Sequence, residues 1–124
     1  ARLTGKSIKE IQCDRINTAR EFAKKWNVNT VLKGAKTVIA SPDGYVCINP
    51  TGNSGMATAG MGDVLTGIIA SLIGQGLKVL DAAVAGVYLH GLAGDSGAQV
   101  KGEYGLIASD LIKELPYVMK EIKI

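Results

Sequence analysis

The residues best suited to chemistry lie in the stretch GNSGMATAGMGDVLTG, residues 52–67, which combines five glycines with a single charged residue, Asp63. Between Gly44 and Lys78, Asp63 is the only Asp, Glu, Lys or Arg. Glycine is costly to order, and an isolated carboxylate among apolar residues is costly to bury. A sequence that keeps both favours a site where bare backbone approaches a ligand and one carboxylate acts on it.

The segment Gly60-Met61-Gly62-Asp63 stands where a loop becomes a helix, because apolar residues follow it at helical intervals: Val64, Leu65, Ile68, Ile69, Leu72 and Ile73. The first N–H groups of a helix lack intrahelical partners, and the helix dipole adds positive potential there. Glycines let those N–H groups approach an anion. The pattern predicts an anion hole suited to a phosphoryl group, with Asp63 beside it. The alternative is that Asp63 only interacts with the helix dipole.

Two common phosphate-binding motifs are absent from this sequence. A Gly-x-Gly-x-x-Gly motif that began at Gly60 would need a glycine where Leu65 stands. The Gly-Lys-Ser of a Walker A motif occurs only at residues 5–7, where Ser7 is better explained as a helix cap. The predicted anion hole is therefore of another kind.

The elements upstream of this loop are predicted from capping, periodicity and turn chemistry. Ser7 and Glu10 form a capping box that begins a helix over residues 8–26. Residues 29–34, NTVLKG, predict a short strand. Residues 37–49 predict a β-hairpin, because two runs of strand-forming residues flank Pro42-Asp43-Gly44.

Three helices are predicted downstream. Residues 50–59 are expected to be a loop, and the first helix begins at Met61 and ends before Gly74 and Gly76. A second apolar helix is expected over residues 79–97 and a third from about Ser109, in which Pro116 predicts a kink or a restart. Helices packed on a short sheet define an α/β fold.

Composition narrows the class of partner. The chain has 124 residues, enough for one domain, and it is 47% hydrophobic, so it can bury a core. Its net charge of +3 comes from scattered lysines without interleaved aromatics, which argues against nucleic acid and leaves anionic small molecules. No apolar run is long enough to span a membrane. Two cysteines without a Cys-x-x-Cys motif predict reduced, partly buried thiols in a cytoplasmic protein.

Three segments of this chain, in the same order, resemble the ADP/ATP-dependent NAD(P)H-hydrate dehydratases, a branch of the ribokinase-like superfamily: VLKGAKTVIASPDGYVCINPTGN, NSGMATAGMGDVLTGIIASLIGQG and AAVAGVYLHGLAGD. The resemblance implies a ribokinase-like α/β/α layered fold. Ser54 stands where the family commonly has proline, and Ala59 where it has glycine. Family domains are more than twice as long, and ARLTG resembles the segment after the family's His-Pro-Gly-Glu motif. We therefore expect residues 1–124 to be the C-terminal part of one such domain.

The resemblance also implies an activity. Water adds to C6 of the nicotinamide ring of NADH or NADPH, and the family removes it again at the expense of ADP or ATP. The hydroxyl is phosphorylated and phosphate then leaves, so the nucleotide becomes AMP or ADP. Asp63 would contact the substrate and act as the general base for the hydroxyl proton. The N–H groups of Gly60, Met61 and Gly62 would stabilise the transferring phosphoryl group.

The resemblance assigns nucleotide binding to two segments. These are Lys33, Gly34, Ala35, Lys36 and Thr37 in the first, and Asn53, Ser54, Gly55, Met56, Ala57, Thr58, Ala59, Gly60, Met61 and Gly62 in the second. Mg²⁺ is expected with the nucleotide, held through phosphates and water because no carboxylate pair resembles a ligand set. By itself, the turn at Lys33 would be an ordinary solvated loop.

Two other interpretations stay open. The chain could belong to a small-molecule kinase of the same superfamily, or it could be a non-catalytic nucleotide-binding fragment of the dehydratase. An incomplete sheet should expose apolar surface, so we also expect a homo-oligomer. His90 is expected to be packed or at a subunit contact, and Asp95 to be a helix-end acid or to face the nucleotide.

Overall fold

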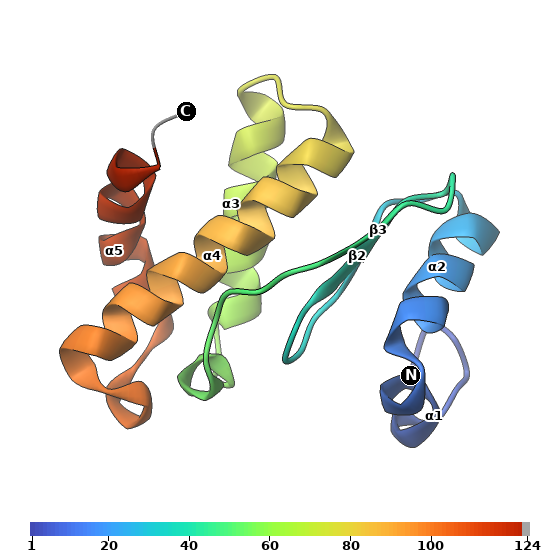
Figure 1. Ribbon diagram of the computed structural model, residues 1–124, viewed down its shortest axis with the longest axis horizontal. Coiled ribbons are helices and arrows are strands. Elements are labelled where there is room, and N and C mark those ends of the chain that lie inside the picture. The colour runs from blue at the N-terminus through green and yellow to red at the C-terminus, as the bar shows by residue number, and fades with distance from the viewer. Residues whose placement is uncertain (123–124) are drawn as a thin grey trace. The chain divides into compact units, whose positions relative to one another are not determined.

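The computed structural model describes residues 1–122, which form two compact units. The first unit, Ala1–Asn49, contains helices α1 (Ile8–Cys13) and α2 (Arg15–Trp26) and three strands, β1 (Thr30–Leu32), β2 (Val38–Ala40) and β3 (Val46–Ile48) (Figure 1). The predicted strand at 29–34 and the predicted hairpin at 37–49 are both confirmed.

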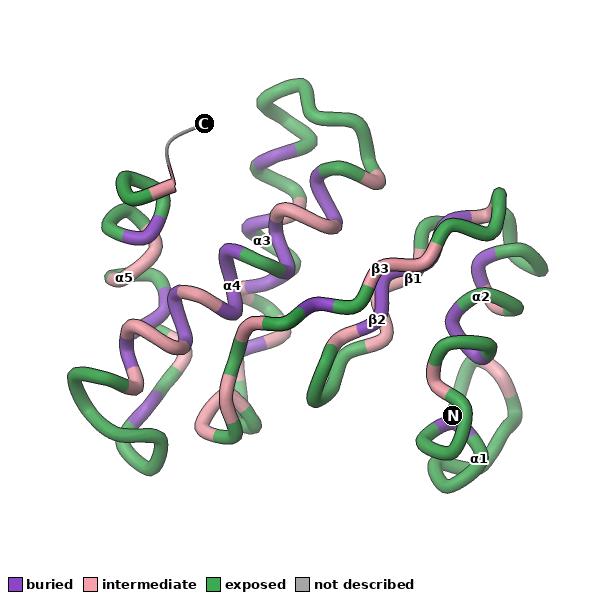
Figure 2. Tube along the Cα trace, viewed as in Figure 1, coloured by how far each residue is buried: buried purple, intermediate pink, exposed green. Residues whose placement is uncertain are grey.

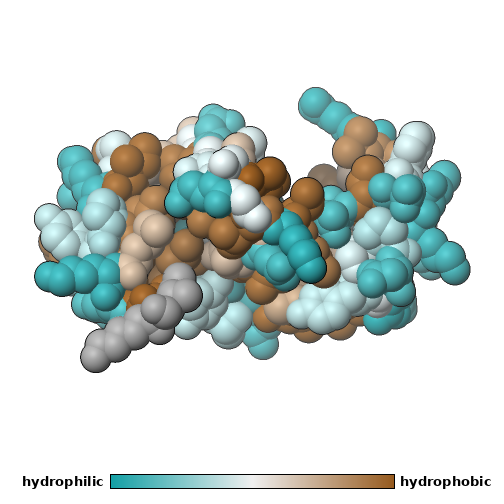
Figure 3. All heavy atoms as spheres, turned by 90° about the horizontal axis from the view of Figure 1, so that it is seen from above, coloured by the Kyte–Doolittle hydropathy of each residue, from teal (hydrophilic) through white to brown (hydrophobic). Residues whose placement is uncertain are grey.

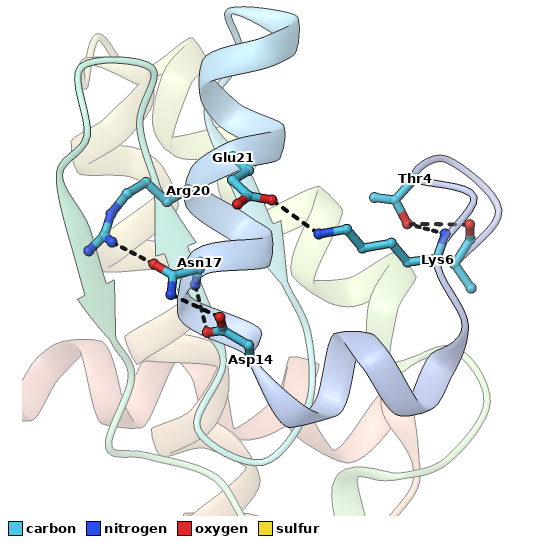
Figure 4. A network of polar contacts seen from close by, with 7 residues as sticks. Thr4, Lys6, Asp14, Asn17, Arg20 and Glu21 are labelled. Atoms are coloured by element: carbon cyan, nitrogen blue, oxygen red, sulfur yellow. Dashed lines mark hydrogen bonds and ion pairs between the residues drawn. The ribbon is translucent and has the colours of Figure 1, made fainter.

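The first predicted helix is divided in two at Asp14. The capping box is confirmed, since Glu10 N–H donates to Ser7 Oγ (3.2 Å) and Ser7 N–H donates to Glu10 Oε2 (2.7 Å). The single helix over 8–26 is wrong, because Asp14 leaves helical geometry (φ −145°, ψ 70°) and its carboxylate accepts the Asn17 N–H (3.2 Å) to cap α2 (Figure 4). A short acidic side chain that binds backbone N–H groups favours a helix start over a helix interior.

The sheet is an antiparallel meander in the order β1-β2-β3. Its hairpin turn is closed by the Ser41 N–H, which donates to the Tyr45 carbonyl (3.0 Å), while Gly44 adopts φ +96°. Helix α2 packs on the sheet through small residues, so Ala19 and Ala23 are buried with Val38 and Ala40 (Figure 2). The first unit therefore has a small core of its own.

The second unit, from Pro50 onward, is helical. Its elements are η1 (Ser54–Met56), α3 (Met61–Gly74), α4 (Val79–Lys101), η2 (Glu103–Gly105) and α5 (Ala108–Glu121). Helix α4 packs against both α3 and α5, and the three helices share one apolar core (Figure 1). The starts of all three predicted helices are confirmed, and the predicted loop at 50–59 contains one short 3₁₀ turn.

Helix α4 is longer than the sequence predicts, because Gly97 does not end it. The helix continues to Lys101, and Gly102 (φ +75°) follows its last residue. A Cβ at Gly97 would lie 2.8 Å from Leu106 Cδ1, so this glycine serves close packing and not helix termination. In α5 the helix runs through Pro116 without a restart, and the neighbouring core residues Leu111 and Val118 are buried. Packing offsets the lost hydrogen bond of the proline.

Within the described residues, no helix is both long and apolar enough to cross a membrane.

A buried carboxylate joins α4 to α5. Asp110 accepts a hydrogen bond from Lys101 Nζ (2.7 Å) and another from the Ile107 N–H (3.1 Å), and only 5% of its side chain is exposed. The Lys101 hydrogen bond and then the Ile107 hydrogen bond lower the pKa of Asp110 from its ordinary value of 3.8, against the opposing effect of burial. The ionised carboxylate thus stabilises the start of α5.

This geometry predicts acid sensitivity. Because the pKa of Asp110 is lower in the folded chain than in the unfolded one, its contribution to stability is present above about pH 4. That contribution is lost as the pH falls through the folded-state pKa. Asp110→Asn should therefore lower the urea midpoint at about pH 7, and the gap from the parent should narrow at about pH 2.5. Glu121→Gln, which removes an exposed carboxylate of α5, should leave the pH profile unchanged. A difference in urea midpoint between Asp110→Asn and the parent that stays constant with pH would contradict this role of Asp110.

Candidate functional site

The start of α3 presents backbone N–H groups that the fold does not use. The first intrahelical hydrogen bond runs from the Val64 N–H to the Gly60 carbonyl (3.1 Å), so the N–H groups of Gly62 and Asp63 have no acceptor within the described residues. The Met61 N–H makes only a long bond to the Thr58 carbonyl (3.5 Å). Gly60 stands at the N-cap with φ +85°, a conformation that glycine adopts readily. These amides have the arrangement expected of an anion hole.

The Asp63 side chain is exposed in the first turn of α3. Within the described part of the chain, its carboxylate has no hydrogen-bond or ion-pair partner. The fold therefore does not use Asp63 to connect elements, and the carboxylate is accessible to a ligand beside the unused N–H groups.

His90 supports the start of α3 from the neighbouring helix. Its ring is buried in α4, and Nε2 lies 2.9 Å from the Met61 carbonyl oxygen. Because a carbonyl can only accept, Nε2 must carry the proton and donate it. The expectation that His90 is packed is confirmed, and its role is to position the backbone at Met61.

Asp95 holds the beginning of the glycine loop. Its two carboxylate oxygens accept hydrogen bonds from the Gly52 N–H (2.9 Å) and from Asn53 Nδ2 (2.9 Å). Asp95 lies inside α4 and not at its end, so the helix-end interpretation is wrong. The Asn53 side chain is also used locally, because its Oδ1 accepts the Gly55 N–H (3.0 Å). The sequence analysis did not predict the hydrogen bonds of Asp95 to Gly52 and Asn53, which connect residues more than forty positions apart.

The middle of the loop packs closely on α4 and η2. A Cβ at Gly94 would lie 2.3 Å from Met56 Sδ, and a Cβ at Gly55 would lie 2.5 Å from the Glu103 carbonyl oxygen. The Ser54 hydroxyl also donates to Glu103 Oε2. Glu103 is a loop contact that sequence reasoning missed. Glycines on one face of α4 were the available signal, since they permit close approach of another segment.

The turn between β1 and β2 carries the other predicted nucleotide-binding residues. Lys33 and Lys36 are exposed, and Thr37 Oγ1 donates to the Gly34 carbonyl (3.1 Å). Gly34 and Lys36 both adopt positive φ, +147° and 54°. Arg15, which the sequence analysis did not select, donates from Nη2 to the Leu32 carbonyl (3.0 Å) at the base of this turn. The turn belongs to the first unit and the glycine loop to the second, so each is a site considered by itself.

The described residues contain no cluster of three or more His, Cys, Asp or Glu side chains that could hold a metal ion. Mg²⁺ usually keeps several waters and binds through one or two carboxylates together with substrate phosphates. The binding of an Mg²⁺ ion through nucleotide phosphates and water stays a prediction.

Comparison with solved structures defines the class of the fold. An ADP/ATP-dependent NAD(P)H-hydrate dehydratase from Bacillus subtilis, co-crystallised with ATP and Mg²⁺, is 38% identical with a TM-score of 0.94, over 97% of this chain and 43% of that one. A ribokinase-like superfamily protein from Enterococcus faecalis is 33% identical with a TM-score of 0.77, over 90% of this chain and 38% of that one. The predicted ribokinase-like α/β fold is confirmed.

The family follows from the sequence comparison. The profile of the NAD(P)H-hydrate dehydratase family (Carb_kinase) matches residues 1–117, so this chain belongs to that family. A bifunctional NAD(P)H-hydrate repair enzyme from Moorella thermoacetica is 56% identical over 123 residues, which are 99% of this chain and 23% of that enzyme. The chain thus spans less than half of the relatives it matches. Which part of the family domain it represents stays a prediction.

Proposed function

We propose that this chain supplies the nucleotide-binding loop and the catalytic base of an NAD(P)H-hydrate dehydratase, a carbon–oxygen lyase that restores NADH and NADPH from their C6 hydrates. The observation that carries the proposal is the exposed carboxylate of Asp63, which lacks a protein partner in the described residues and stands beside unused N–H groups at the start of α3. Membership of the family supports the choice of substrate.

The reaction divides into two steps. In the first, the C6 hydroxyl of the hydrate attacks the terminal phosphorus of ADP or ATP, and Asp63 takes the hydroxyl proton. The P–O bond to the nucleotide breaks, so AMP or ADP leaves. In the second, the C6–O bond breaks, C5 loses a proton, and phosphate leaves with the bonding electrons. A general base of this kind contributes a factor of about 10²–10⁴.

The backbone around Gly60 and Gly62 would stabilise the phosphoryl group during transfer. The N–H groups of Gly62 and Asp63 need no rearrangement, because no protein acceptor in the described residues competes for them. The Met61 N–H would exchange its long bond to Thr58 for a shorter one to phosphate. Mg²⁺ would neutralise phosphate charge when it accompanies the nucleotide.

Among the other residues assigned to nucleotide binding, some make hydrogen bonds within the protein and others are exposed. Asn53 and Ser54 make hydrogen bonds within the protein, so we propose that they shape the loop around the nucleotide. Lys33, Lys36 and the Gly34–Ala35 backbone are exposed, and we propose that they contact the nucleotide directly.

We also propose a cytoplasmic location, which is consistent with the two free cysteines. Cys13 is exposed, so the expectation that both thiols are partly buried is wrong for this residue.

One experiment tests the proposed function. The product of the gene that encodes this chain is incubated with NADH hydrate and either ADP or ATP, and NADH recovery is followed by its absorbance. Nucleotide-dependent recovery with release of one phosphate per NADH is expected. A kinase of the same superfamily would instead phosphorylate an added alcohol and restore no NADH. Nucleotide binding without either reaction would mean a non-catalytic fragment.

We further propose that the chain self-associates. Several large apolar side chains are exposed, including Trp26 (57%) and Val28 (42%) in the first unit and Ile112 (58%) in the second. Hydrophobic side chains also reach the face that Figure 3 displays. Burial of such surface against a second copy is favourable. Sedimentation at tens of micromolar should show a species heavier than the 12.9 kDa monomer, and a single monomer peak would contradict the proposal.

A further inference from the structure

Arg15 is bound to the turn between β1 and β2 by its guanidinium group. Arg15 is the first residue of α2, and its Nη2 donates to the carbonyls of Leu32 (3.0 Å) and Lys33 (3.2 Å). Its Nη1 donates to Gln12 Oε1 (3.2 Å). One side chain thus connects the start of a helix with the end of β1, where the Lys33–Thr37 turn begins.

The guanidinium also packs directly against Gly34. A Cβ at Gly34 would lie 2.8 Å from Arg15 Nη1 and 2.9 Å from Nη2, so the guanidinium at the end of the Arg15 side chain would have to shift to admit it. Gly34 has φ +147°, a backbone conformation that residues with a side chain rarely adopt. The glycine at this position therefore leaves room for the Arg15 guanidinium, and the turn and the arginine fit together as a pair.

No ion pair within residues 1–122 neutralises the charge of Arg15. Among the ion pairs of the described residues, none includes Arg15, and the acceptors of its hydrogen bonds are the neutral oxygens of Gln12, Leu32 and Lys33. Arg15 is only half-buried, and Lys33 and Lys36 on the same turn are exposed. Three positive charges therefore lie on or beside one short turn, which favours an anion there.

We propose that Arg15 is a positioning residue for the nucleotide: it holds the Lys33–Thr37 turn in its binding conformation and adds an uncompensated positive charge beside it. This inference rests on the proposed function, in which that turn contacts the nucleotide. Arginine suits the role because its planar guanidinium donates from two nitrogens in a fixed geometry, here from Nη2 to the two turn carbonyls and from Nη1 to Gln12, whereas lysine has a single ammonium nitrogen.

Three variants test this role. Arg15→Met removes the charge and the fork, Arg15→Lys keeps the charge without the fork, and Arg20→Met is the matched control. Arg20 lies on the same helix, is exposed, and donates to Asn17 Oδ1 (2.8 Å) (Figure 4). The Kd for ADP and for ATP is measured by calorimetry with excess Mg²⁺. Amide order parameters of residues 34–37 are measured by NMR without nucleotide.

We expect Arg15→Met to raise the Kd about tenfold and Arg15→Lys about threefold, with Arg20→Met unchanged. The order parameters of the turn should fall toward about 0.6 in Arg15→Met from a rigid value near about 0.85, at an unchanged thermal midpoint. A merely structural role would lower the thermal midpoint and leave the Kd of the folded protein unchanged.

Two results would overturn the inference. One is a parent-like Kd and a rigid turn in Arg15→Met. The other is an affinity fully restored by Arg15→Lys with a rigid turn in both variants, since charge alone would then explain the effect. If the parent chain binds neither ADP nor ATP, the proposed function is wrong, whatever the role of Arg15. The order parameters then decide whether Arg15 positions the turn.

Discussion

Asp63→Asn should lower the rate of NADH recovery by a factor of about 10²–10⁴, with the Kd for nucleotide changed less than about threefold. Asparagine keeps the size and shape of the side chain but cannot accept the hydroxyl proton. The carboxylate makes no hydrogen bond or ion pair in the described residues, so its replacement should not disturb the loop. The measurement is the nucleotide-dependent rate in the product of the gene, beside a calorimetric Kd.

Asp81→Asn is a closely matched control for this prediction. Asp81 occupies the third position of α4, as Asp63 does in α3, and both side chains are exposed. Each substitution therefore removes a similar interaction with a helix dipole, which is worth about 0.3–1 kcal/mol of stability. If Asp63 served only the dipole, the two variants would have the same activity. Turnover retained in Asp63→Asn would exclude its role as the general base.

Gly91→Ala should destabilise the second unit by about 1–3 kcal/mol, because it adds a methyl group where there is no space. A Cβ at Gly91 would lie 1.9 Å from Thr51 Oγ1 and 2.8 Å from the Thr51 carbonyl carbon, so the backbone of the loop would have to move. Thr51 also donates to the Tyr88 carbonyl (3.1 Å). The loss of stability is measured as a lower thermal midpoint, and the displacement of the loop as weaker nucleotide binding.

Gly67→Ala should change stability in the opposite direction. Gly67 lies inside α3, and nothing lies within 4 Å of a Cβ added there. Alanine in an open helical position is more favourable than glycine by about 0.5–1 kcal/mol. The same substitution is therefore expected to lower the free energy of unfolding at Gly91 and to raise it at Gly67. Equal effects at both positions would contradict the packing assigned to Gly91.

Local features of the sequence were sufficient to predict several secondary-structure elements and the centre of the candidate site. The capping box at Ser7 and Glu10, the hairpin turn at residues 42–44 and the helix start after Gly60 each depend on residues within a few positions of one another. Their geometry follows from backbone hydrogen bonding and from glycine conformations, which short motifs determine. For the same reason, the position of Asp63 beside unused N–H groups could be predicted, but the exposure of its side chain was not.

The tertiary structure decided the features that depend on distant residues. Asp95 accepts the Gly52 N–H, His90 donates to the Met61 carbonyl, and Arg15 donates to the turn after β1. Each of these roles could be recognised only from a partner that is distant in the sequence. The predicted end of α4 at residue 97 was wrong, because the helix continues to Lys101 and Gly97 lies where Leu106 packs closely against it. A sequence pattern describes a residue's neighbours along the chain, while hydrogen-bond partners and close contacts across the fold exist only after the elements pack together.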